Sequence, residues 1–504
     1  MSDVNAALFV ALGDVASEPI EQTGPTGDFT YVDISSIDRE SKKIVGAKII
    51  PTAEAPSRAR QVLRPGDVLV SMTRPNLNAV SIVPDNLNGA IASTGFHVLR
   101  SKWIEPKFLF NLVQTDEFID SMCDVVQGAL YPAVRPKDIA SFTFTLPSLN
   151  QQIRIVEKLE ELLSDLDAGV AELKAAQAKL VRYRQSLLKA AVEGALTAEW
   201  RQHNIPEKTG AQLLQRILTE RRARWETKQL IKFTEQGRAP PKDWQKKYPE
   251  PVQPDTRDLP ELPVGWVWAS LDQLSLMVRN GLSQKPSPER IGIPILRINA
   301  VRPMAVNLDE VRYLPLTEIE ANDYLLDEGD LLATRYNGSV DLLGVFGVVR
   351  GIKTPTVHPD KLIRIKPVFA NELADWIEIC SCVGASRKHL VSRVKTTAGQ
   401  TGISGEDVKK MPIPLAPYVE QAGSIKCVAK ALLEVKAQSI AIEASLKQST
   451  AQRKNILRAA FSGQLVPQNP NDEPASALLA RIRAGRATDA STTLRRRKRT
   501  DAGE

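Results

Sequence analysis

Two segments of the chain carry apolar residues at the spacing of a long helix that packs along its length against another helix. Apolar residues recur every four and then three positions over 156–191, and again over 425–460. An average spacing of 3.5 residues is typical of a helix that forms a coiled coil. Prolines precede the two segments, at Pro147 and Pro417, but are absent within them. Each segment therefore predicts one uninterrupted helix, and about 40 residues at ~1.5 Å per residue give a rod of about 60 Å.

The ends of these two segments are nearly the same peptide. RQSLLKAAVEGAL occupies 184–196 and RKNILRAAFSGQL occupies 453–465, at a constant shift of 269 positions. The glycines, Gly194 and Gly463, stand where a helix C-cap is expected. Two similar apolar seams in one chain are most simply buried against each other, and the pattern alone allows parallel or antiparallel pairing.

The segments that precede the two helices are also repeated, more weakly. RPGDVLVSMTRPN at 64–76 and DEGDLLATRYN at 327–337 share Gly-Asp, an apolar run typical of a strand, and then Thr-Arg-x-Asn. Each half then has a charged turn into a short apolar segment and the long helix. The sequence thus predicts an α+β protein with a pseudo-two-fold internal repeat, in which two mixed α/β domains are each followed by a long α-helix and the two helices pair as a coiled-coil spacer.

Composition shifts divide the chain further. A basic helix-like stretch and a Pro-rich stretch separate the halves, and a basic run, RRRKR, lies at 495–499. The predicted segments are a first globular domain at 1–147, a central helical spacer region with a basic helix and Pro-rich linker at 148–258, a second globular domain at 259–414, a C-terminal helical spacer region at 415–484 and a basic disordered tail at 485–504.

The charge of the chain is compatible with an anionic partner such as DNA. The formal net charge is +7 and the pI is about 9.1, although a solvated basic face gives the same balance. We find no apolar run long enough to cross a membrane and no signal peptide, so the sequence predicts a cytoplasmic protein. Scattered cysteines and histidines predict no metal site.

Catalytic motifs are scarce. Phosphate-binding and dinucleotide-binding glycine motifs are absent from the sequence. The best nuclease candidate combines Asp85 with Glu105 and Lys107, but Pro106 disfavours the strand that such a metal-binding pattern needs. By elimination, the sequence predicts a protein that binds rather than reacts.

The stretches LPSLNQQIRIVEKLEELL, RQSLLKAAVEGALTAEWR and LPVGWVW, within the repeated layout, resemble the specificity (HsdS) subunit of type I restriction-modification enzymes. The resemblance implies that each globular domain is a target recognition domain for one half of a bipartite, asymmetric site in double-stranded DNA. It also implies docking of two methyltransferase (HsdM) subunits on the helices and two restriction-motor (HsdR) subunits in the full complex. The subunit itself would be non-catalytic and hold no cofactor, while the complex would use S-adenosylmethionine, ATP and Mg. A coiled-coil scaffold with protein-binding domains, and a nuclease, are the alternatives.

Candidate DNA contacts follow from residue chemistry. Arginine can bridge guanine O6 and N7, and asparagine can pair with adenine N6 and N7, although a surface turn with a solvated arginine shows the same pattern. The candidates in and beside the Thr-Arg-x-Asn segments are Arg74, Asn76, Asn78, Arg335, Tyr336 and Asn337. Those in the loops before each long helix are Tyr131, Arg135, Lys137, Lys395, Thr397 and Gln400. Arg297 and Asn299 are further candidates, in a segment that core packing would explain equally well.

A second group of candidates belongs to the spacer and to partner docking. These residues match between the two copies of the repeated peptide: Arg184, Leu188, Gly194, Arg453, Leu457 and Gly463. We expect charge reversal at either arginine to disturb helix pairing or partner docking and to leave base preference unchanged. For the tail run we expect only salt-sensitive, non-specific affinity for DNA.

Overall fold

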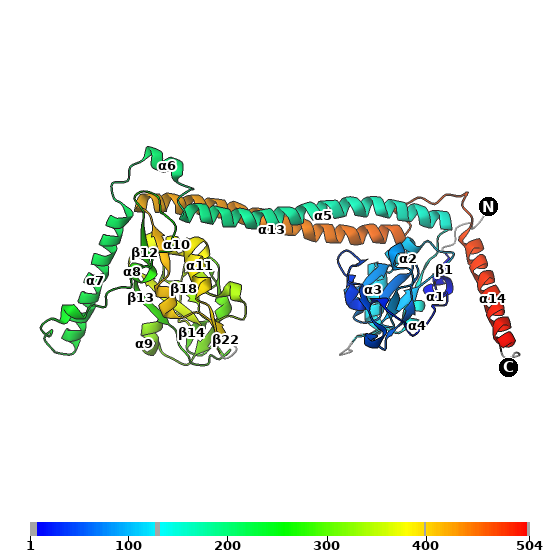
Figure 1. Cartoon of the computed structure of the whole chain (residues 1–504), viewed down its shortest axis with the longest axis horizontal. Coiled ribbons are helices and arrows are strands. Elements are labelled where there is room, and N and C mark those ends of the chain that lie inside the picture. The colour runs from blue at the N-terminus through cyan, green and yellow to red at the C-terminus, as the bar shows by residue number, and fades with distance from the viewer. Residues whose placement is uncertain (1–7, 127–131, 398–399, 501–504) are drawn as a thin grey trace. The chain divides into compact units, whose positions relative to one another are not determined.

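A computed structural model describes residues 8–126, 132–397 and 400–500. The chain forms two compact units, one of Met1–Ala175 with Ile442–Glu504 and one of Ala176–Ala441. Each unit holds one β-rich domain and part of both long helices, α5 (Leu149–Val192) and α13 (Tyr418–Phe461) (Figure 1). The sequence predicts five successive segments, whereas the structure joins distant stretches of chain into two units.

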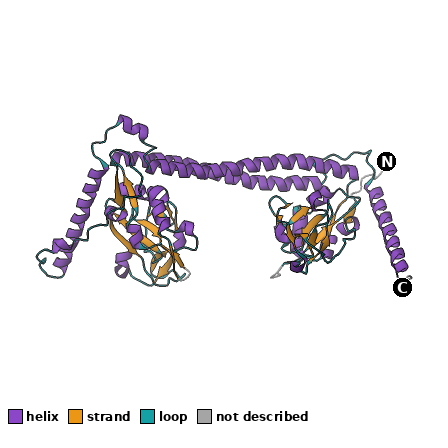
Figure 2. Cartoon of the chain, viewed as in Figure 1, coloured by secondary structure: helices purple, strands orange, loops and turns teal. Residues whose placement is uncertain are grey.

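The β-rich domain of the first unit is built on short strands (Figure 2). A three-stranded sheet has the order β10-β7-β8, a four-stranded sheet has the order β5-β2-β9-β6, and β1 pairs with β11. The strands are β1 Phe9–Ala11, β2 Phe29–Val32, β3 Ile37–Asp38, β4 Lys43–Ile44, β5 Lys48–Ile50, β6 Ala59–Val62, β7 Val68–Ser71, β8 Val80–Ile82, β9 Ile91–Ser93, β10 Phe96–Leu99 and β11 Thr143–Thr145. The helices are α1 Leu12–Val15, α2 Pro106–Leu112, α3 Asp116–Val125, α4 Pro136–Ala140 and α14 Ala475–Thr500.

The second unit repeats this plan with a larger main sheet, β13-β20-β18-β19, and with β12 paired to β23. Its strands are β12 Val267–Ser270, β13 Ser275–Asn280, β14 Ile293–Leu296, β15 Val301–Arg302, β16 Ala305–Val306, β17 Val311–Leu314, β18 Leu331–Thr334, β19 Phe346–Val348, β20 Leu362–Pro367, β21 Lys395–Thr397, β22 Gln400–Gly402 and β23 Pro412–Leu415. Its helices are α6 Ala198–His203, α7 Gly210–Glu235, α8 Leu271–Leu274, α9 Glu318–Ala321, α10 Ala370–Cys382, α11 Gly384–Ser392 and α12 Gly405–Lys409.

A buried ion pair explains the repeated Gly-Asp motif. Asp67 accepts a hydrogen bond from Nε of Arg100 at 2.6 Å, and Asp330 accepts one from Nε of Arg364 at the same distance. All four residues are less than a tenth exposed. Each aspartate also accepts from the backbone N–H three positions earlier, which fixes the turn before the strand. The motif therefore ties the entry of β7 to the end of β10, and the entry of β18 to β20.

The two long helices run antiparallel, as the contacts inside each unit show. In the first unit, Leu159 near the start of α5 shares a core with Leu457 near the end of α13. In the second unit, Leu188 near the end of α5 shares a core with Val428 near the start of α13. The predicted long helices and their pairing are confirmed, and the direction that the sequence left open is antiparallel.

The repeated glycines end the two helical repeats in the same way. Gly194 and Gly463 have φ of +75° and +78°, the left-handed conformation that glycine adopts without strain. Two residues further on, the N–H of Leu196 donates to the carbonyl of Ala190, and the N–H of Leu465 donates to that of Ala459, both at 3.0 Å. The matching Ala, Gly and Leu positions of the repeated peptide thus form a shared helix end.

A shorter helix follows each of these ends and is anchored to its own unit. Leu213 and Ile217 of α7 lie in the core of the second unit, and Leu478 and Ile482 of α14 lie in the core of the first. The structure differs here from the sequence prediction, because α14 extends to Thr500, so the stretch 485–500 is helical rather than disordered. Arginine, which favours helix, occurs five times in this stretch.

Candidate nucleic-acid interface

In the first unit, the Thr-Arg-x-Asn segment lies beside the loop that precedes α4. Arg74 follows β7 in the left-handed conformation, with φ of +50°, and its side chain is exposed. Its backbone N–H donates to the carbonyl of Pro132 at 2.8 Å, and the N–H of Val134 donates to Met72 at the same distance. These bonds bring two candidate segments, distant in sequence, to one edge of the domain.

The second unit makes the same juxtaposition after β18. The N–H of Ile403 donates to the carbonyl of Arg335 at 2.9 Å, and Tyr336 pairs with Gly402. Gly402 belongs to β22, which pairs antiparallel with β21, and the backbones of Thr397 and Gln400 face each other in this pairing. The candidate residues after β18 therefore adjoin the β21–β22 strand pair.

The electrostatics of this second cluster favour an anion. The Arg335 guanidinium stands 4.7 Å from the centre of the Tyr336 ring, and Nζ of Lys361 stands 4.9 Å from it. Among the described residues, neither cation forms an ion pair, and Nε of Arg335 is buried with no hydrogen-bond partner. Sequence reasoning missed Lys361, which is 26 positions from Arg335 and reaches the site through the backbone bond from the Arg335 N–H to the Lys361 carbonyl.

The remaining polar candidates are partly occupied by neighbours. Arg135 pairs with Asp138 at 3.1 Å, and hydrogen bonds from Arg135 lower the pKa of the Asp138 carboxyl. Lys137 is exposed at the start of α4, as Asn76 is on the turn after β7. Asn337 accepts a hydrogen bond from the N–H of Ser339 at 3.0 Å.

Arg297 and Asn299 both donate to one carboxylate oxygen of Glu310, at 3.2 and 3.1 Å. The Asn299 amide oxygen is buried without a partner in the described part of the chain. Because Glu310 neutralises Arg297, this pair is a weaker candidate for phosphate contact. No hydrogen bond or ion pair among the described residues joins the pair to Arg335.

Asn78 requires a correction. Its side chain is 9% exposed, its amide donates to the Val113 carbonyl at 2.7 Å, and its amide oxygen accepts from Nζ of Lys42 at 3.0 Å. Because both ends of the amide are engaged inside the domain, Asn78 holds the turn rather than reading a base. Tyr131, another candidate, lies outside the described residues.

Two of the spacer and docking candidates are buried. Leu188 and Leu457 are 3% and 4% exposed, so in this structure they pack the helices against the domains, as a spacer role requires. Gly194 has a packing role, because a Cβ on it would come within 2.6 Å of Pro263. A Cβ on Gly463 would meet nothing within 4 Å.

Arg453 forms an ion pair with Asp167 of α5, which makes it a contact between the two helices.

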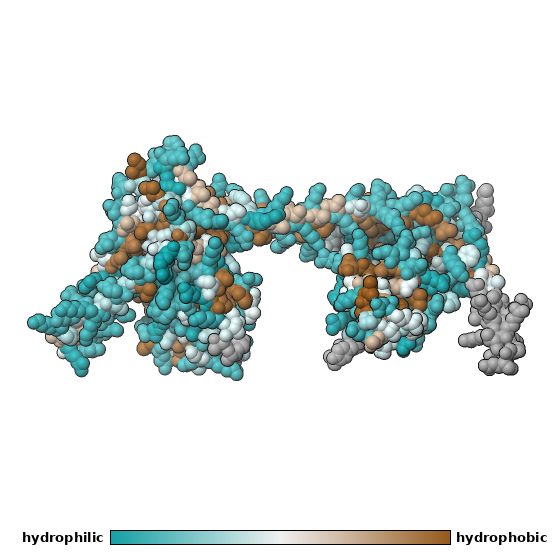
Figure 3. Space-filling view, in the orientation of Figure 1, coloured by the Kyte–Doolittle hydropathy of each residue, from teal (hydrophilic) through white to brown (hydrophobic). Residues whose placement is uncertain are grey.

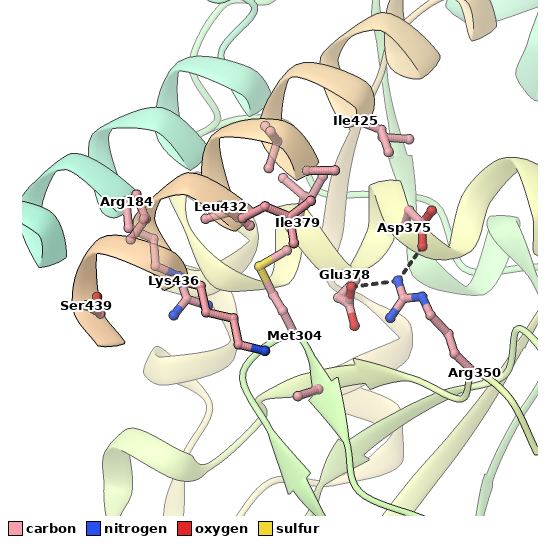
Figure 4. Close-up of a pocket in the computed structure, with 15 residues that line it drawn as sticks. Arg184, Met304, Arg350, Asp375, Glu378, Ile379, Ile425, Leu432, Lys436 and Ser439 are labelled. Atoms are coloured by element: carbon pink, nitrogen blue, oxygen red, sulfur yellow. Dashed lines mark hydrogen bonds and ion pairs between the residues drawn. The ribbon is translucent and has the colours of Figure 1, made fainter. Parts of the chain in front are cut away.

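Arg184 lines a pocket of about 720 Å³ in the second unit, between α10, α13 and the turn that carries Met304 (Figure 4). Ile425, Leu432 and Ile379 give it an apolar wall. At its edge, Arg350 pairs with Asp375 at 2.5 Å and with Glu378 at 3.1 Å. The pocket therefore lies where the long helices meet the second domain, and the charge of Arg350 at its edge is already neutralised.

The nuclease alternative finds no support in the local structure. Asp85 begins a one-turn 3₁₀ helix, Glu105 caps the N-terminus of α2, and Lys107 pairs with Glu160 at 2.5 Å. None of the three lies on a strand, which the metal-binding nuclease pattern requires. Within the described residues, no cluster of three or more His, Cys, Asp or Glu side chains could hold a metal ion.

In the described part of the chain, no helix is long and apolar enough to cross a membrane. This applies to the two 44-residue helices, α5 and α13.

Known proteins share this layout. The family profile described as "Type I restriction modification DNA specificity domain" matches residues 25–174. The chain is 29% identical over 454 residues to the type I restriction enzyme EcoKI specificity subunit of Escherichia coli K12, covering 87% of this chain and 85% of the relative. It is 24% identical to the StySPI specificity subunit of Salmonella potsdam, covering 79% and 75%. A solved structure from a study of complex assembly and conformational transition in a type I R-M system shares the fold, with a TM-score of 0.64 and 24% identity over 91% of this chain and 98% of that chain.

The matched family profile is thus described as a DNA specificity domain, and the matched relatives are named specificity subunits of type I restriction enzymes. The chain is similar to the HsdS family, the specificity subunits of type I restriction-modification enzymes. The resemblance found in the sequence is thereby confirmed.

Proposed function

We propose that the chain reads a bipartite, asymmetric site in double-stranded DNA, with one half-site for each β-rich domain. The observation that carries this proposal is a juxtaposition made in both units. The arginine after β7 adjoins the loop before α4, and the arginine after β18 adjoins the β21–β22 strand pair before α12. The two clusters share the arginine and the asparagine of Thr-Arg-x-Asn, but the position between them is Pro75 in one cluster and Tyr336 in the other. Different side chains at equivalent positions discriminate different bases.

We further propose that two methyltransferase subunits dock on the helical repeats. An internal repeat presents two similar surfaces, which suits two identical partners. In the second unit these surfaces include exposed apolar side chains, with Tyr183 on α5 51% exposed and Leu433 on α13 70% exposed. Apolar side chains in such positions are typical of interfaces.

In this proposal, two restriction-motor subunits complete the assembly, and the other subunits supply S-adenosylmethionine, ATP and Mg chemistry. The residues of this chain hold and orient the DNA. They position the target base for the methyltransferase and take no part in bond making.

The test is selection from a random pool of duplex DNA with the chain assembled with its methyltransferase subunits. The proposal expects a motif of two unlike half-sites separated by a constant gap. A single contiguous motif would restrict reading to one domain. Absence of any motif would favour the scaffold alternative and reject DNA recognition.

A further inference from the structure

The second unit carries a basic arm, residues 221–248, formed by the distal part of α7 and the segment that folds back along it. Between Arg221 and Tyr248 the chain has nine lysines and arginines but only three acidic residues. The resulting charge of +6 compares with +7 for the whole chain, so the remainder is almost neutral. The distal part of α7 and the returning segment present a hydrophilic surface (Figure 3).

Aromatic side chains hold the returning segment against α7. Trp225 stacks on Trp244 with ring centres 5.8 Å apart and lies 5.4 Å from the ring of Tyr248. Further along the helix, Phe233 meets Trp244 edge to face at 5.9 Å. A disordered basic run would need to be ordered on binding, whereas these contacts already order the arm.

The arm is fixed to its unit at the base. Leu213 and Ile217 of α7 are buried in the core of the second unit. Arg221, also buried, donates from Nε to the Ser275 carbonyl at 3.0 Å. The basic charges beyond this point are therefore presented on a supported helix.

Four lysines of the arm, Lys228, Lys232, Lys242 and Lys247, are exposed and form no ion pair with any described residue. Lys228 and Lys232 lie four residues apart on α7, which places them about 6 Å apart along the axis on one side of the helix. Exposed lysines without carboxylate partners are compact point charges that suit a regular polyanion. They carry no base-reading geometry.

The second copy of the repeat carries a corresponding charge. Lys228 and Lys232 follow the anchoring Ile217 by 11 and 15 positions, and the run Arg495–Arg499 of α14 follows the anchoring Ile482 by 13 to 17 positions. Two helices anchored alike thus become basic at similar distances from their anchors.

We propose that the basic arm binds the phosphate backbone of duplex DNA and contributes affinity without sequence information. The proposal rests on DNA being the partner in the proposed function, and it adds a second surface that no base-reading candidate occupies. It applies to DNA outside the half-sites, so its effect is the same on every sequence.

The experiment compares three forms of the chain, each assembled with its methyltransferase subunits: the natural protein, the variant K228Q/K232Q/K242Q/K247Q and the matched control K228R/K232R/K242R/K247R. Binding to a random-sequence duplex is measured at about 50 to 200 mM salt. Each phosphate contact adds about 0.9 to the steepness with which log affinity falls against log salt. We expect the Gln variant to reduce the slope by about 3 to 4, with a selected motif identical to that of the natural protein. The Arg control should retain the slope.

Two results would overturn the proposal. One is an unchanged slope in the Gln variant. The other is loss of the methyltransferase from the Gln variant, measured by light scattering, which would make the arm a protein-docking surface. The pair L230S/I231S tests that second reading directly, since Leu230 and Ile231 are the exposed apolar residues of α7, at 44% and 53%, and our proposal expects it to leave the slope unchanged. Because binding to random duplex requires no half-site, failure of the bipartite motif would be seen separately.

Discussion

The indole Nε1–H of Trp266 donates a hydrogen bond to a carboxylate oxygen of Glu420 across 2.9 Å. The other oxygen of Glu420 accepts from the hydroxyl of Thr197 at 2.6 Å and forms an ion pair with Arg201. The tryptophan comes from the LPVGWVW stretch, the threonine and arginine follow the first long helix, and the glutamate begins the second. One buried carboxylate therefore joins the entry of the second domain to both helices.

Removing this carboxylate should loosen the whole junction. We expect Glu420→Ala to destabilise the second unit by about 3 kcal/mol, since it leaves a partly buried arginine without its counter-charge. Hydrogen–deuterium exchange of the β12 and α6 amides would report the loss locally. Glu443→Ala, an exposed position on the same helix, is the matched control and should change exchange little. Equal protection in both variants would contradict the central role of Glu420.

The two strand-end arginines should act on different half-sites. Arg74→Ala is expected to relax base preference in one half of the selected motif, and Arg335→Ala in the other half, each by about 1 to 3 kcal/mol of discrimination. Binding assays on duplexes with single-base changes in each half measure this. Asn78→Ala serves as the control, because its buried amide predicts lower stability and an unchanged motif. If both arginine variants affected the same half, the one-domain, one-half-site arrangement would be wrong.

The sequence predicted the two long helices because apolar periodicity is a local property. It could not give their direction, since an apolar seam at 3.5-residue spacing packs equally well against a parallel or an antiparallel partner. The direction follows from which residues share a core, as Leu159 does with Leu457. That pairing depends on the whole fold.

At the candidate interface too, the sequence showed local motifs but not the distant residues that pack against them. The repeated Gly-Asp motif was visible in the sequence, but its partners Arg100 and Arg364 lie more than 30 positions away, and only the sheet brings them together. Arg74 and Asn78 looked alike in sequence, yet the turn exposes the first and buries the second. Nothing in the sequence around Lys361 indicates that it lies at the candidate interface.

Acid should weaken the second unit through His358. This side chain is fully buried, and burial, with nearby Arg364, lowers its pKa to about 4. The unfolded chain, with an ordinary pKa of 6.5, binds the proton first as pH falls, so stability is present above 6.5 and is lost between 6.5 and 4. At pH 5 the loss amounts to about 2 kcal/mol.

Denaturation at pH 7.5 and pH 5, followed by exchange of the β20 amides, tests this effect. His358→Gln should show a smaller change between the two pH values than the natural protein does. His203→Gln, at an exposed position on α6, should behave as the natural protein. An acid response that is identical in all three would assign it to other groups.

The ion pair between Arg453 and Asp167 is a contact between the two helices inside the first unit. Both side chains are partly exposed, at 35% and 62%, so the pair contributes about 0.5 kcal/mol or less.

Arg453→Glu replaces attraction by repulsion and should increase hydrogen–deuterium exchange of the amides in this part of α5. The double variant Arg453→Asp with Asp167→Arg, which swaps the two charges, should restore protection. Lys447→Glu changes the same charge at an exposed position on α13 and should leave that exchange unchanged. No hydrogen bond or ion pair among the described residues joins either residue to Arg74 or Arg335, so the selected DNA motif should be the same in every variant. A changed motif would show that the helix contact also controls base reading.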